Sequence, residues 1–372
     1  MIDPGIATDV ATLREVAREA GSLARELRPI AAETAWEKTP GHPVTEADLA
    51  VNTLIARRLG HARPEYGWLS EETVDDFGNR SQARIWVVDP IDGTRAYMRA
   101  GDPFWCVGIA VVEAGEVIAG VIYAPDFDHL YEARRGGGAY LNGDPIFVST
   151  RACESGCRII ATESMIAHPS WPEPWPEMII ADPKPNATLL RMALVASGAW
   201  DATLALFRKS DWDLAPGAIL VREAGGAAST HLGEPYASNR SVPAQRSLIA
   251  SGKRLHPLLM RRTSHVVLPE PAGEGAKPET QSKPESTTMD QSPTPTKQLL
   301  HIVIGGELKD VTEVEFEDLA KIDFVGAFPN YAAAYDAWKS AAQRTVDNAE
   351  MRYFILHAHK LLDPETGSHH HV

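Results

Sequence analysis

The chain has 372 residues, 44% of them hydrophobic and 23% charged, which is typical of a folded globular protein and excludes a fully disordered one. Lys and Arg number 36 against 50 Asp and Glu, and this formal net charge of −14 disfavours a duplex-DNA binder, which needs a basic face. No apolar run of about 18 residues predicts a membrane span, no secretory signal pattern opens the chain, and three cysteines cannot pair fully. We therefore expect a reduced, cytoplasmic protein with no membrane or nucleic-acid partner.

The N-terminal two thirds of the sequence predict helices and strands in blocks. In chain order, the predicted elements are helices at 10–27 and after Thr45, strands at 84–89, 105–112, 117–123, 131–134 and 139–141, and helices at 187–198 and about 212–225. Pro29 marks the end of the first helix, and the Asn-Gly pair at 142–143 marks a tight turn. Because strands and helices do not alternate strictly, we expect a layered α+β domain over residues 1–265.

The composition changes sharply after this domain. Residues 269–297 contain six prolines among Glu, Ser, Thr, Gln and Lys, and such a segment buries too little apolar surface to fold. We predict a flexible linker at 266–297 and a small α+β domain at 298–364. The small domain is predicted to have ββαβ order, with strands at 299–304, 322–328 and 351–357 and a helix at 331–349.

The most informative segment is Asp-Pro-Ile-Asp-Gly-Thr at 89–94, directly after the apolar strand. Pro90 favours a turn, and Gly93 lets the backbone approach a ligand closely. The backbone N–H groups of Gly93 and Thr94 would open the next helix, where a phosphate binds well. Carboxylates beside such groups suit a Mg²⁺ ion that bridges to phosphate, because oxygen ligands select this ion over softer metals. The alternative is a loop with solvated aspartates.

Three further acidic clusters strengthen the first interpretation. Glu71 and Glu72 follow an apolar run, while Asp48 and Asp213 each stand at the start of a predicted helix. Any one of these carboxylates is explained as a helix cap or a surface charge. Their combination with residues 89–94 favours a site for metal ions and phosphate.

These segments resemble the lithium-sensitive, Mg²⁺-dependent phosphomonoesterases, which include inositol monophosphatases and 3′(2′),5′-bisphosphate nucleotidases. Residues 89–94 match the family motif Asp-Pro-(Ile/Leu)-Asp-Gly-Thr in full, and residues 212–217 match Trp-Asp-x-Ala-x-Gly. Residues 71–73 match the upstream Glu-Glu-(Ser/Thr), and the resemblance covers about residues 5–260. It implies a layered αβαβα sandwich, a homodimer and sensitivity to lithium.

The resemblance also implies a ligand set for two or three Mg²⁺ ions. The ligands that it implies are Glu71, Asp89 and the carbonyl of Ile91 for the first ion, and Asp89, Asp92 and Asp213 for the second. Asp48 would bind a third ion through water. Thr94 and Glu71 would orient the water that attacks phosphorus in line, and the backbone N–H groups of Gly93 and Thr94 would hold the phosphate.

Departures from the family patterns bear on the substrate. Arg95 stands where related sequences carry other residues, and a guanidinium there would pair with a second phosphate; the alternative is a solvated arginine. Leu206 stands where inositol monophosphatases place a glutamate for inositol hydroxyls, and an apolar wall suits a nucleobase better than a polyol. We therefore expect a small phosphorylated metabolite, with adenosine 3′,5′-bisphosphate ahead of inositol 1-phosphate.

A different class of function also stays open at this point. The chain would then be a catalytically weakened relative that binds or regulates, with its C-terminal domain as the interaction module. That domain resembles a small uncharacterised bacterial domain that also occurs alone, so its partner is not indicated. The presence of every implied carboxylate ligand favours the enzyme.

Overall fold

The computed structural model describes residues 4–268 except 34, 40, 41, 74 and 76, and, nearer the C-terminus, residues 301–307, 309, 316–328, 334, 337, 338, 341 and 351–356. We call the first set the N-terminal part and the second set the C-terminal part. The chain divides into two compact units. Almost all of the predicted linker at 266–297 lies outside the described residues, so the predicted domain limits stay predictions.

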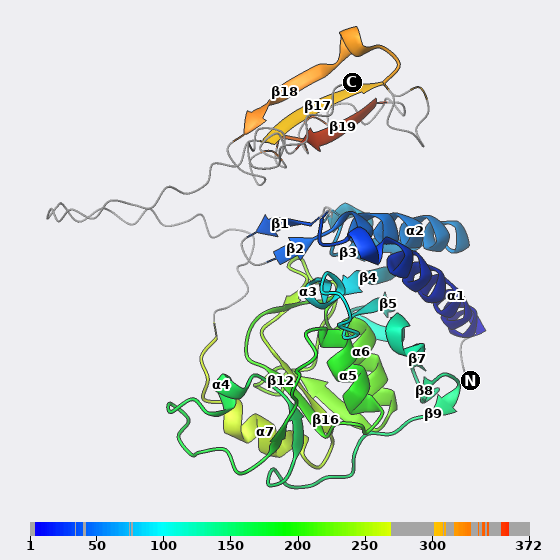
Figure 1. Cartoon of the computed structure of the whole chain (residues 1–372). Coiled ribbons are helices and arrows are strands. Elements are labelled where there is room, and N and C mark those ends of the chain that lie inside the picture. The colour runs from blue at the N-terminus through cyan, green and yellow to red at the C-terminus, as the bar shows by residue number, and fades with distance from the viewer. Residues whose placement is uncertain are drawn as a thin grey trace, which may run out of the picture. The chain divides into compact units, whose positions relative to one another are not determined.

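Each helix predicted for the N-terminal part has a counterpart in the structure, whereas the helices at Glu163–Ile166 and His256–Thr263 were not predicted (Figure 1). Among the described residues the helices are α1 (Pro4–Leu27), α2 (Glu46–Ala62), α3 (Thr94–Tyr97), α4 (Glu163–Ile166), α5 (Thr188–Ala196), α6 (Ala215–Glu223) and α7 (His256–Thr263). The helix predicted from residue 212 begins instead at Ala215. Short 3₁₀ turns lie at Arg28–Ile30, Phe77–Arg80 and Pro125–Phe127.

A seven-stranded sheet is the larger of the two main sheets in the described N-terminal part. Its order is β3 (Gly67–Ser70), β4 (Arg84–Asp92), β5 (Cys106–Glu113), β6 (Glu116–Ala124), β7 (His129–Arg134), β8 (Ala139–Leu141) and β9 (Asp144–Pro145). β3 pairs with β4 in parallel, and the other neighbours pair antiparallel. The strands predicted at 105–112, 117–123, 131–134 and 139–141 therefore correspond to β5, β6, β7 and β8.

The second main sheet has five strands in the described residues. Its order is β11 (Ile179–Ile180), β10 (Arg158–Ile160), β12 (Ala202–Ala205), β16 (Leu248–Gly252) and β14 (Gly226–Ser229). Two small strand pairs are also described: β1 (Trp36–Thr39) with β2 (His42–Val44), and β13 (Lys209–Ser210) with β15 (Ala244–Gln245). Residues 37–42 of the first pair belong to the second compact unit.

Three hydrophobic cores hold the five layers of the N-terminal part together. One core joins α1 and α2 to one face of the seven-stranded sheet. The next joins the opposite face of that sheet to α5 and α6 and to the five-stranded sheet. The third lies between the five-stranded sheet and α7. The order helix, sheet, helix, sheet, helix confirms the predicted αβαβα sandwich, and Figure 1 shows α5 and α6 in the middle of it.

The burial of β4 on both faces explains why its sequence is a continuous apolar run. Ile85 and Val87 point into the core with α5 and α6, while Trp86 and Val88 point into the core with α1 and α2. All four side chains are at most 1% exposed. A strand covered on both faces has no polar face, so its sequence does not alternate.

The start of α2 is held by a capping box. The hydroxyl of Thr45 accepts from the backbone N–H of Asp48 at 3.4 Å, and the backbone N–H of Thr45 donates to Asp48 Oδ2 at 2.7 Å. Both side chains are at most 2% exposed. This reciprocal arrangement satisfies two donors that the first turn of a helix leaves unpaired, and it fixes the position of the Asp48 carboxylate.

The C-terminal part contains a three-stranded antiparallel sheet. Its order is β18 (Asp323–Phe328), β17 (His301–Glu307) and β19 (Met351–Leu356). Ala334 and Ala341, both in helical conformation, are fully buried, and Trp338 Nε1 donates to the carbonyl of Tyr353 at 2.8 Å. These features confirm a small separate α+β domain, although most of the predicted helix at 331–349 lies outside the described residues.

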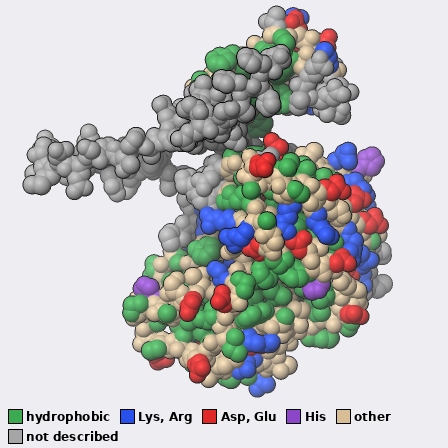
Figure 2. Space-filling view, in the orientation of Figure 1, with side chains coloured by type: hydrophobic (Ala, Val, Ile, Leu, Met, Phe, Trp, Pro, Cys, Tyr) green, Lys and Arg blue, Asp and Glu red, His purple; other side chains and the backbone are tan. Residues whose placement is uncertain are grey.

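The surface and the helices add two observations. Figure 2 shows acidic and basic side chains interspersed on the visible face of the N-terminal part, without a broad field of one sign. Among the helices that the structure describes, none combines the length and apolar character that crossing a bilayer requires.

Candidate metal centre and active site

A bulge at the end of β4 brings Asp89 and Asp92 to one place. Asp89 lies opposite Gly108 of β5 and Asp92 lies opposite Cys106, so three steps along β4 match two steps along β5. In a regular strand, residues three apart point to opposite faces of the sheet. The extra residue corrects this alternation, and it also accommodates Pro90 inside a sheet, where proline is otherwise disfavoured. The turn predicted at Pro90 is therefore a strand bulge.

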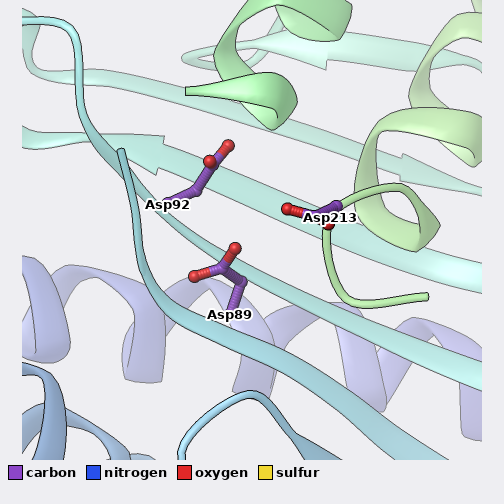
Figure 3. A group of neighbouring side chains, drawn as sticks. All are labelled: Asp89, Asp92 and Asp213. Carbon is purple, nitrogen blue, oxygen red and sulfur yellow. The ribbon is translucent and has the colours of Figure 1, made fainter. Parts of the chain in front are cut away.

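Asp213 completes a cluster of three carboxylates with Asp89 and Asp92. One oxygen from each residue lies within 4.8 Å of the others. Figure 3 shows the carboxyl groups around a shared space, two from the end of β4 and the third from the loop before α6. Asp213 is held in this loop because its Oδ2 accepts from the backbone N–H of Ser210 at 2.9 Å.

Burial and mutual repulsion of the carboxylates in this cluster favour the binding of a cation. Burial, followed by the charges of Glu71, Asp92, Asp213 and Asp48, raises the pKa of Asp89 well above its usual range. Burial and the charge of Asp213 raise the pKa of Asp92 to about 6. Among the described residues, none hydrogen-bonds the buried Oδ1 of Asp89. Like charges gathered in a buried space are stable when a metal ion neutralises them.

The donor set fits a hard divalent cation. The three side chains offer only oxygen, which suits Mg²⁺, Mn²⁺ or Ca²⁺ better than zinc. Cys106 Sγ lies 3.9 Å from Asp92 Oδ2, but burial raises the pKa of this thiol well above its usual range, so it stays protonated. A soft thiolate ligand is therefore not offered here.

Asp48 and Thr94 lie side by side at the edge of the cluster. The hydroxyl of Thr94 lies 3.3 Å from Asp48 Oδ1 and 3.2 Å from the carbonyl oxygen of Ile91. Because Thr45 already occupies Asp48 Oδ2, the other oxygen of Asp48 is the one turned to Thr94. The N-terminus of α2 and the end of β4 thus meet at this threonine.

Glu71 and Ile91 are both held by backbone positions of β4: Glu71 by a hydrogen bond to Val88, and Ile91 as a residue of the strand. The N–H of Glu71 donates to the carbonyl of Val88 at 3.2 Å, which holds the end of β3 beside β4. Glu71 is half-buried and close enough to raise the pKa of Asp89. The side chain of Ile91 is 1% exposed, and its carbonyl oxygen accepts from the hydroxyl of Thr94 at 3.2 Å.

Gly93 occupies a position that other residues fit poorly. Its φ of +91° lies in the left-handed region, and a Cβ there would lie 3.0 Å from the carbonyl oxygen of Phe104 and from the Cβ of Ala187. The glycine precedes α3, whose first residue is Thr94. The turn between strand and helix therefore depends on glycine.

Two cations, Lys209 and Arg191, lie near the cluster. Lys209 Nζ lies 3.8 Å from Asp213 Oδ1 and donates to the hydroxyl of Thr188 at 2.6 Å. Arg191 is 5% exposed and donates to the carbonyls of Pro185 and Asn186, which fixes the loop before α5. Lys209 lies in β13 and Asp213 follows four residues later, and this spacing is the sequence signal for the first contact.

Arg95 and Leu206 were singled out for substrate choice, and they lie in different surroundings. Arg95 is exposed on α3, directly after Thr94. Leu206 follows β12 and is half-buried against the third core. The exposed ring of Phe207 comes next in the chain and lies 5.1 Å from Lys209 Nζ.

Asp211 is a neighbouring carboxylate with a structural role. It is 1% exposed, and its oxygens accept from Gln245 Nε2 at 2.8 Å and from the backbone N–H of Asn239 at 2.7 Å. These bonds fix the loop that carries Asp213. Of the two carboxylates in this loop, only Asp213 therefore joins the cluster of three.

Comparison with known proteins gives consistent results for fold and site. The Inositol monophosphatase family model matches residues 7–268, and a Domain of unknown function (DUF4170) matches residues 299–358. The chain is 33% identical over 267 residues to an inositol-1-monophosphatase of Mesorhizobium japonicum, covering 64% of this chain and 94% of that protein. It is 33% identical over 233 residues to a histidinol-phosphatase of Chlorobaculum parvum, covering 60% of this chain and 86% of that protein.

Solved structures agree with this result. The crystal structure of the extragenic suppressor protein suhB from Bartonella henselae has a TM-score of 0.59 and 27% identity, covering 70% of this chain and all of that one. An inositol monophosphatase from Thermotoga maritima has a TM-score of 0.58 and 26% identity, covering 69% and 96%. Fold and site thus define a phosphatase that hydrolyses phosphoric monoesters of small molecules. The chain belongs to the inositol monophosphatase family, whose members depend on metal ions.

Proposed function

We propose that the chain is a Mg²⁺-dependent phosphomonoesterase whose reaction takes place at the cluster of Asp89, Asp92 and Asp213. The observation that carries this proposal is the convergence of three carboxylates within 4.8 Å around a buried oxygen that no described residue hydrogen-bonds. A bound Mg²⁺ supplies positive charge for the phosphate and lowers the pKa of a coordinated water. We expect two or three ions.

The proposed ligand set uses all of the carboxylates around β4. The residues that would hold metal ions are Glu71, Asp89, the carbonyl of Ile91, Asp92 and Asp213, with Asp48 holding a further ion through water. In support, Glu71 and Asp48 both lie close enough to raise the pKa of Asp89. Asp89 is central to this set because its pKa responds to every other carboxylate in it.

Protein groups at the start of α3 position the reactants. Thr94 and Glu71 orient the attacking water, and the Thr94 hydroxyl is itself fixed by Asp48 Oδ1 and the Ile91 carbonyl. The backbone N–H groups of Gly93 and Thr94 hold the phosphate. Precise positioning matters here because phosphoryl transfer depends mainly on orientation and charge stabilisation.

For the substrate, we propose a nucleoside 3′,5′-bisphosphate such as adenosine 3′,5′-bisphosphate. Arg95 is exposed next to Thr94, where it can reach a second phosphate. Leu206 and Phe207 present apolar surface on the side of Lys209 and Asp213. Inositol 1-phosphate is the second candidate, and the named activity of the Mesorhizobium japonicum relative favours it.

A phosphate-release assay on the full chain tests this proposal. The substrates are adenosine 3′,5′-bisphosphate, inositol 1-phosphate, histidinol phosphate and fructose 1,6-bisphosphate, each with Mg²⁺ and with EDTA. We expect release that requires Mg²⁺ and is fastest with the nucleotide. Faster release from inositol 1-phosphate would select the second candidate, and no release from any substrate would favour a binding or regulatory protein.

The assembly and location of the protein are also proposals. By family resemblance we expect a homodimer that acts in the cytoplasm on small metabolites rather than on nucleic acid. Light scattering during gel filtration measures the oligomeric state directly. A monomer at micromolar concentration would contradict the expected dimer.

A further inference from the structure

A surface pocket is lined by residues at and after α4, by Leu206 and by residues that follow α7. It has a volume of about 380 Å³, which falls in the range of small-molecule sites. Its apolar wall comprises Met165, Trp171, Leu206 and Val266, and two imidazoles, His168 and His265, complete the lining. Leu206 belongs both to this wall and to the loop that leads to Asp213.

The aromatic wall of the pocket is fixed in place. Trp171 Nε1 donates to the carbonyl of Met165 at 2.7 Å. The indole also packs edge-on against His265, with ring centroids 5.5 Å apart, and against Trp175 at 5.3 Å. A rigid aromatic surface binds a flat ring with little loss of conformational entropy.

The polar groups of the pocket are few. His168 Nδ1 lies 2.6 Å from the hydroxyl of Ser170 and 3.3 Å from its backbone N–H, and these contacts hold the imidazole in the lining. The hydrogen-bonding atoms of the lining are therefore confined to a few side chains, such as the imidazoles of His168 and His265. A polyol needs a partner for each of its hydroxyl groups, and a mainly apolar wall does not supply them.

Two connections place the pocket within reach of the metal cluster. Leu206 and Lys209 are three positions apart in the chain, so their Cα atoms are at most about 10 Å apart. Lys209 Nζ in turn lies 3.8 Å from Asp213 Oδ1. On the other side, Lys184 Nζ donates to the hydroxyl of Thr162 at 3.0 Å, just before α4 and Met165.

Lys184 adds a cation between the pocket and the cluster. Burial and the positive charges of Arg191 and Lys209 lower the pKa of Lys184, so these three cations lie near one another. An anionic group of a ligand placed among them would relieve their mutual repulsion. A ring in the pocket and a phosphate at the carboxylates match two parts of a nucleoside bisphosphate, and Lys184 offers its second phosphate a partner alternative to Arg95.

We propose that this pocket is a subsite of the active site that takes the flat heteroaromatic ring of the substrate, namely a nucleobase. The proposal rests on the proposed phosphatase function. An imidazole, as in histidinol phosphate, offers the same ring chemistry in a smaller form and is distinguished by experiment. The pocket thereby becomes the element that selects ring-bearing substrates over polyol phosphates.

The first test compares Trp171→Ala with Phe147→Ala in the full chain. Phe147 is a matched control because it is an exposed aromatic residue, at 70% exposure, outside the pocket lining. The measured quantity is the ratio of kcat/KM for adenosine 3′,5′-bisphosphate to kcat/KM for β-glycerophosphate, which has no ring. Base–aromatic stacking predicts that Trp171→Ala lowers this ratio by roughly 5- to 150-fold, whereas Phe147→Ala leaves it unchanged. A ratio unchanged in Trp171→Ala would overturn the proposal.

A second measurement does not depend on catalysis. Saturation-transfer NMR with adenosine, in EDTA, tests whether the ring alone binds the pocket; imidazole and inositol serve as comparison probes. We expect transfer to adenosine that is lost in Trp171→Ala and in Leu206→Glu but kept in Phe147→Ala. Stronger transfer to imidazole than to adenosine would overturn the nucleobase assignment.

The two measurements separate the pocket from the proposed function. Adenosine binding that depends on Trp171, together with no Mg²⁺-dependent phosphate release, would support the pocket and contradict the phosphatase function. Release that requires Mg²⁺, together with adenosine binding that Trp171→Ala leaves intact, would overturn the pocket alone. Leu206→Glu provides the second variant if Trp171→Ala fails to fold.

Discussion

The carboxylate of Asp92 accepts a hydrogen bond from the backbone N–H of Leu189, 97 residues further along the chain, at 2.5 Å. This bond joins the end of β4 to the first turn of α5, so it ties the larger sheet to the helical layer beneath it. The N-terminal turn of a helix offers unpaired N–H groups that stabilise a negative charge. The cluster of Asp89, Asp92 and Asp213 therefore combines residues of the sheet and of the helical layer, and neither layer contains the cluster alone.

Asp92→Asn is expected to abolish turnover while the fold remains. The amide oxygen still accepts from Leu189, whereas the charge that would neutralise a metal ion is lost. Weakening one metal position costs several kcal/mol of transition-state stabilisation, so kcat should fall by about 10³-fold or more. Phosphate release at saturating Mg²⁺ and the melting temperature are the measurements. Asp144→Asn, at an exposed carboxylate, is the control, and near wild-type activity in Asp92→Asn would show that the site is wrongly assigned.

Removal of metal should make the stability of the N-terminal part fall as the pH rises through about 6. Burial and Asp213 raise the pKa of Asp92 to about 6, so the folded state holds this proton at pH values where the unfolded chain has released it. Ionisation above that pH therefore stabilises the unfolded state relative to the folded one. Asp92→Asn removes this contribution, and added Mg²⁺ offsets it by binding the folded state.

The measurement is the melting temperature in EDTA at pH 5 and pH 7.5. The wild type should lose more stability over this interval than Asp92→Asn. The variant has the same titrating groups as the wild type apart from the carboxyl group at position 92. Equal pH dependence of the melting temperature in the two proteins would show that burial and Asp213 do not raise the pKa of Asp92 in the folded state. Mg²⁺ added at pH 7.5 should raise the wild-type melting temperature more than that of the variant.

Thr94→Val is expected to lower kcat by about 10²-fold, because it removes the hydroxyl between Asp48 and Ile91 while it keeps the shape of the side chain. Thr94→Ser retains the hydroxyl and should keep most of the activity. Steady-state kinetics with saturating Mg²⁺ separates the two variants. If serine and valine reduced kcat equally, the role of Thr94 would be packing rather than positioning.

The sequence predicted the fold class and the residues of the cluster, but not the geometry that joins them. The apolar run of β4 and the carboxylates after it can be recognised in the sequence. A strand buried on both faces requires apolar residues, and a site for a hard cation requires oxygen ligands. The bulge between Asp89 and Asp92 cannot be predicted from the sequence, since it depends on pairing with β5. Pro90 indicates an irregularity at this point, but the sequence alone favours a turn there.

Contacts made by residues far apart in sequence were also missed. The bond from Leu189 to Asp92 and the contact between Asp48 and Thr94 depend on how layers pack, which local patterns do not encode. The pocket lined by Trp171 and Leu206 has the same origin, because its wall combines three separate segments. Leu206 was noticed only as a departure from the family pattern.

A fragment of residues 1–271 is expected to fold and to hydrolyse phosphate esters. The family match ends at residue 268, and the three cores of the N-terminal part are built from residues before that point. The Mesorhizobium japonicum relative is covered over 94% of its length by 64% of this chain, which leaves it too little sequence for a counterpart of the C-terminal part. Activity and melting temperature of the fragment and the full chain are compared, and an insoluble or inactive fragment would mean that the C-terminal part supports the phosphatase.

Lithium is expected to inhibit the enzyme in the millimolar range by competing with Mg²⁺, as the family resemblance implies. The carboxylates of Asp89, Asp92 and Asp213 offer hard oxygen ligands, which bind small hard cations whether these are monovalent, as Li⁺ is, or divalent, as Mg²⁺ is. A Li⁺ titration at low Mg²⁺ is the measurement, with K⁺ at equal ionic strength as the control. Activity that stays constant across the titration contradicts the expectation.

Arg95→Ala tests the second phosphate of the proposed substrate. If the guanidinium pairs with that phosphate, the variant should lose turnover of adenosine 3′,5′-bisphosphate selectively. A hydrogen bond to a charged group contributes about 1.5–3 kcal/mol, which corresponds to a roughly ten- to hundredfold loss in kcat/KM. Inositol 1-phosphate has no second phosphate, so its hydrolysis should change little.

Arg99→Ala is the matched control for Arg95→Ala, because Arg99 is an exposed arginine in the same segment that pairs with Asp102 at 3.1 Å. Both substrates must be measured on each variant, since a displaced metal ion would slow both reactions. An equal loss on both substrates in Arg95→Ala would move Arg95 from substrate selection to the general structure of the site. If neither reaction slowed, Arg95 would be an ordinary surface charge, and the choice of a nucleotide would rest on Leu206 and the pocket beside it.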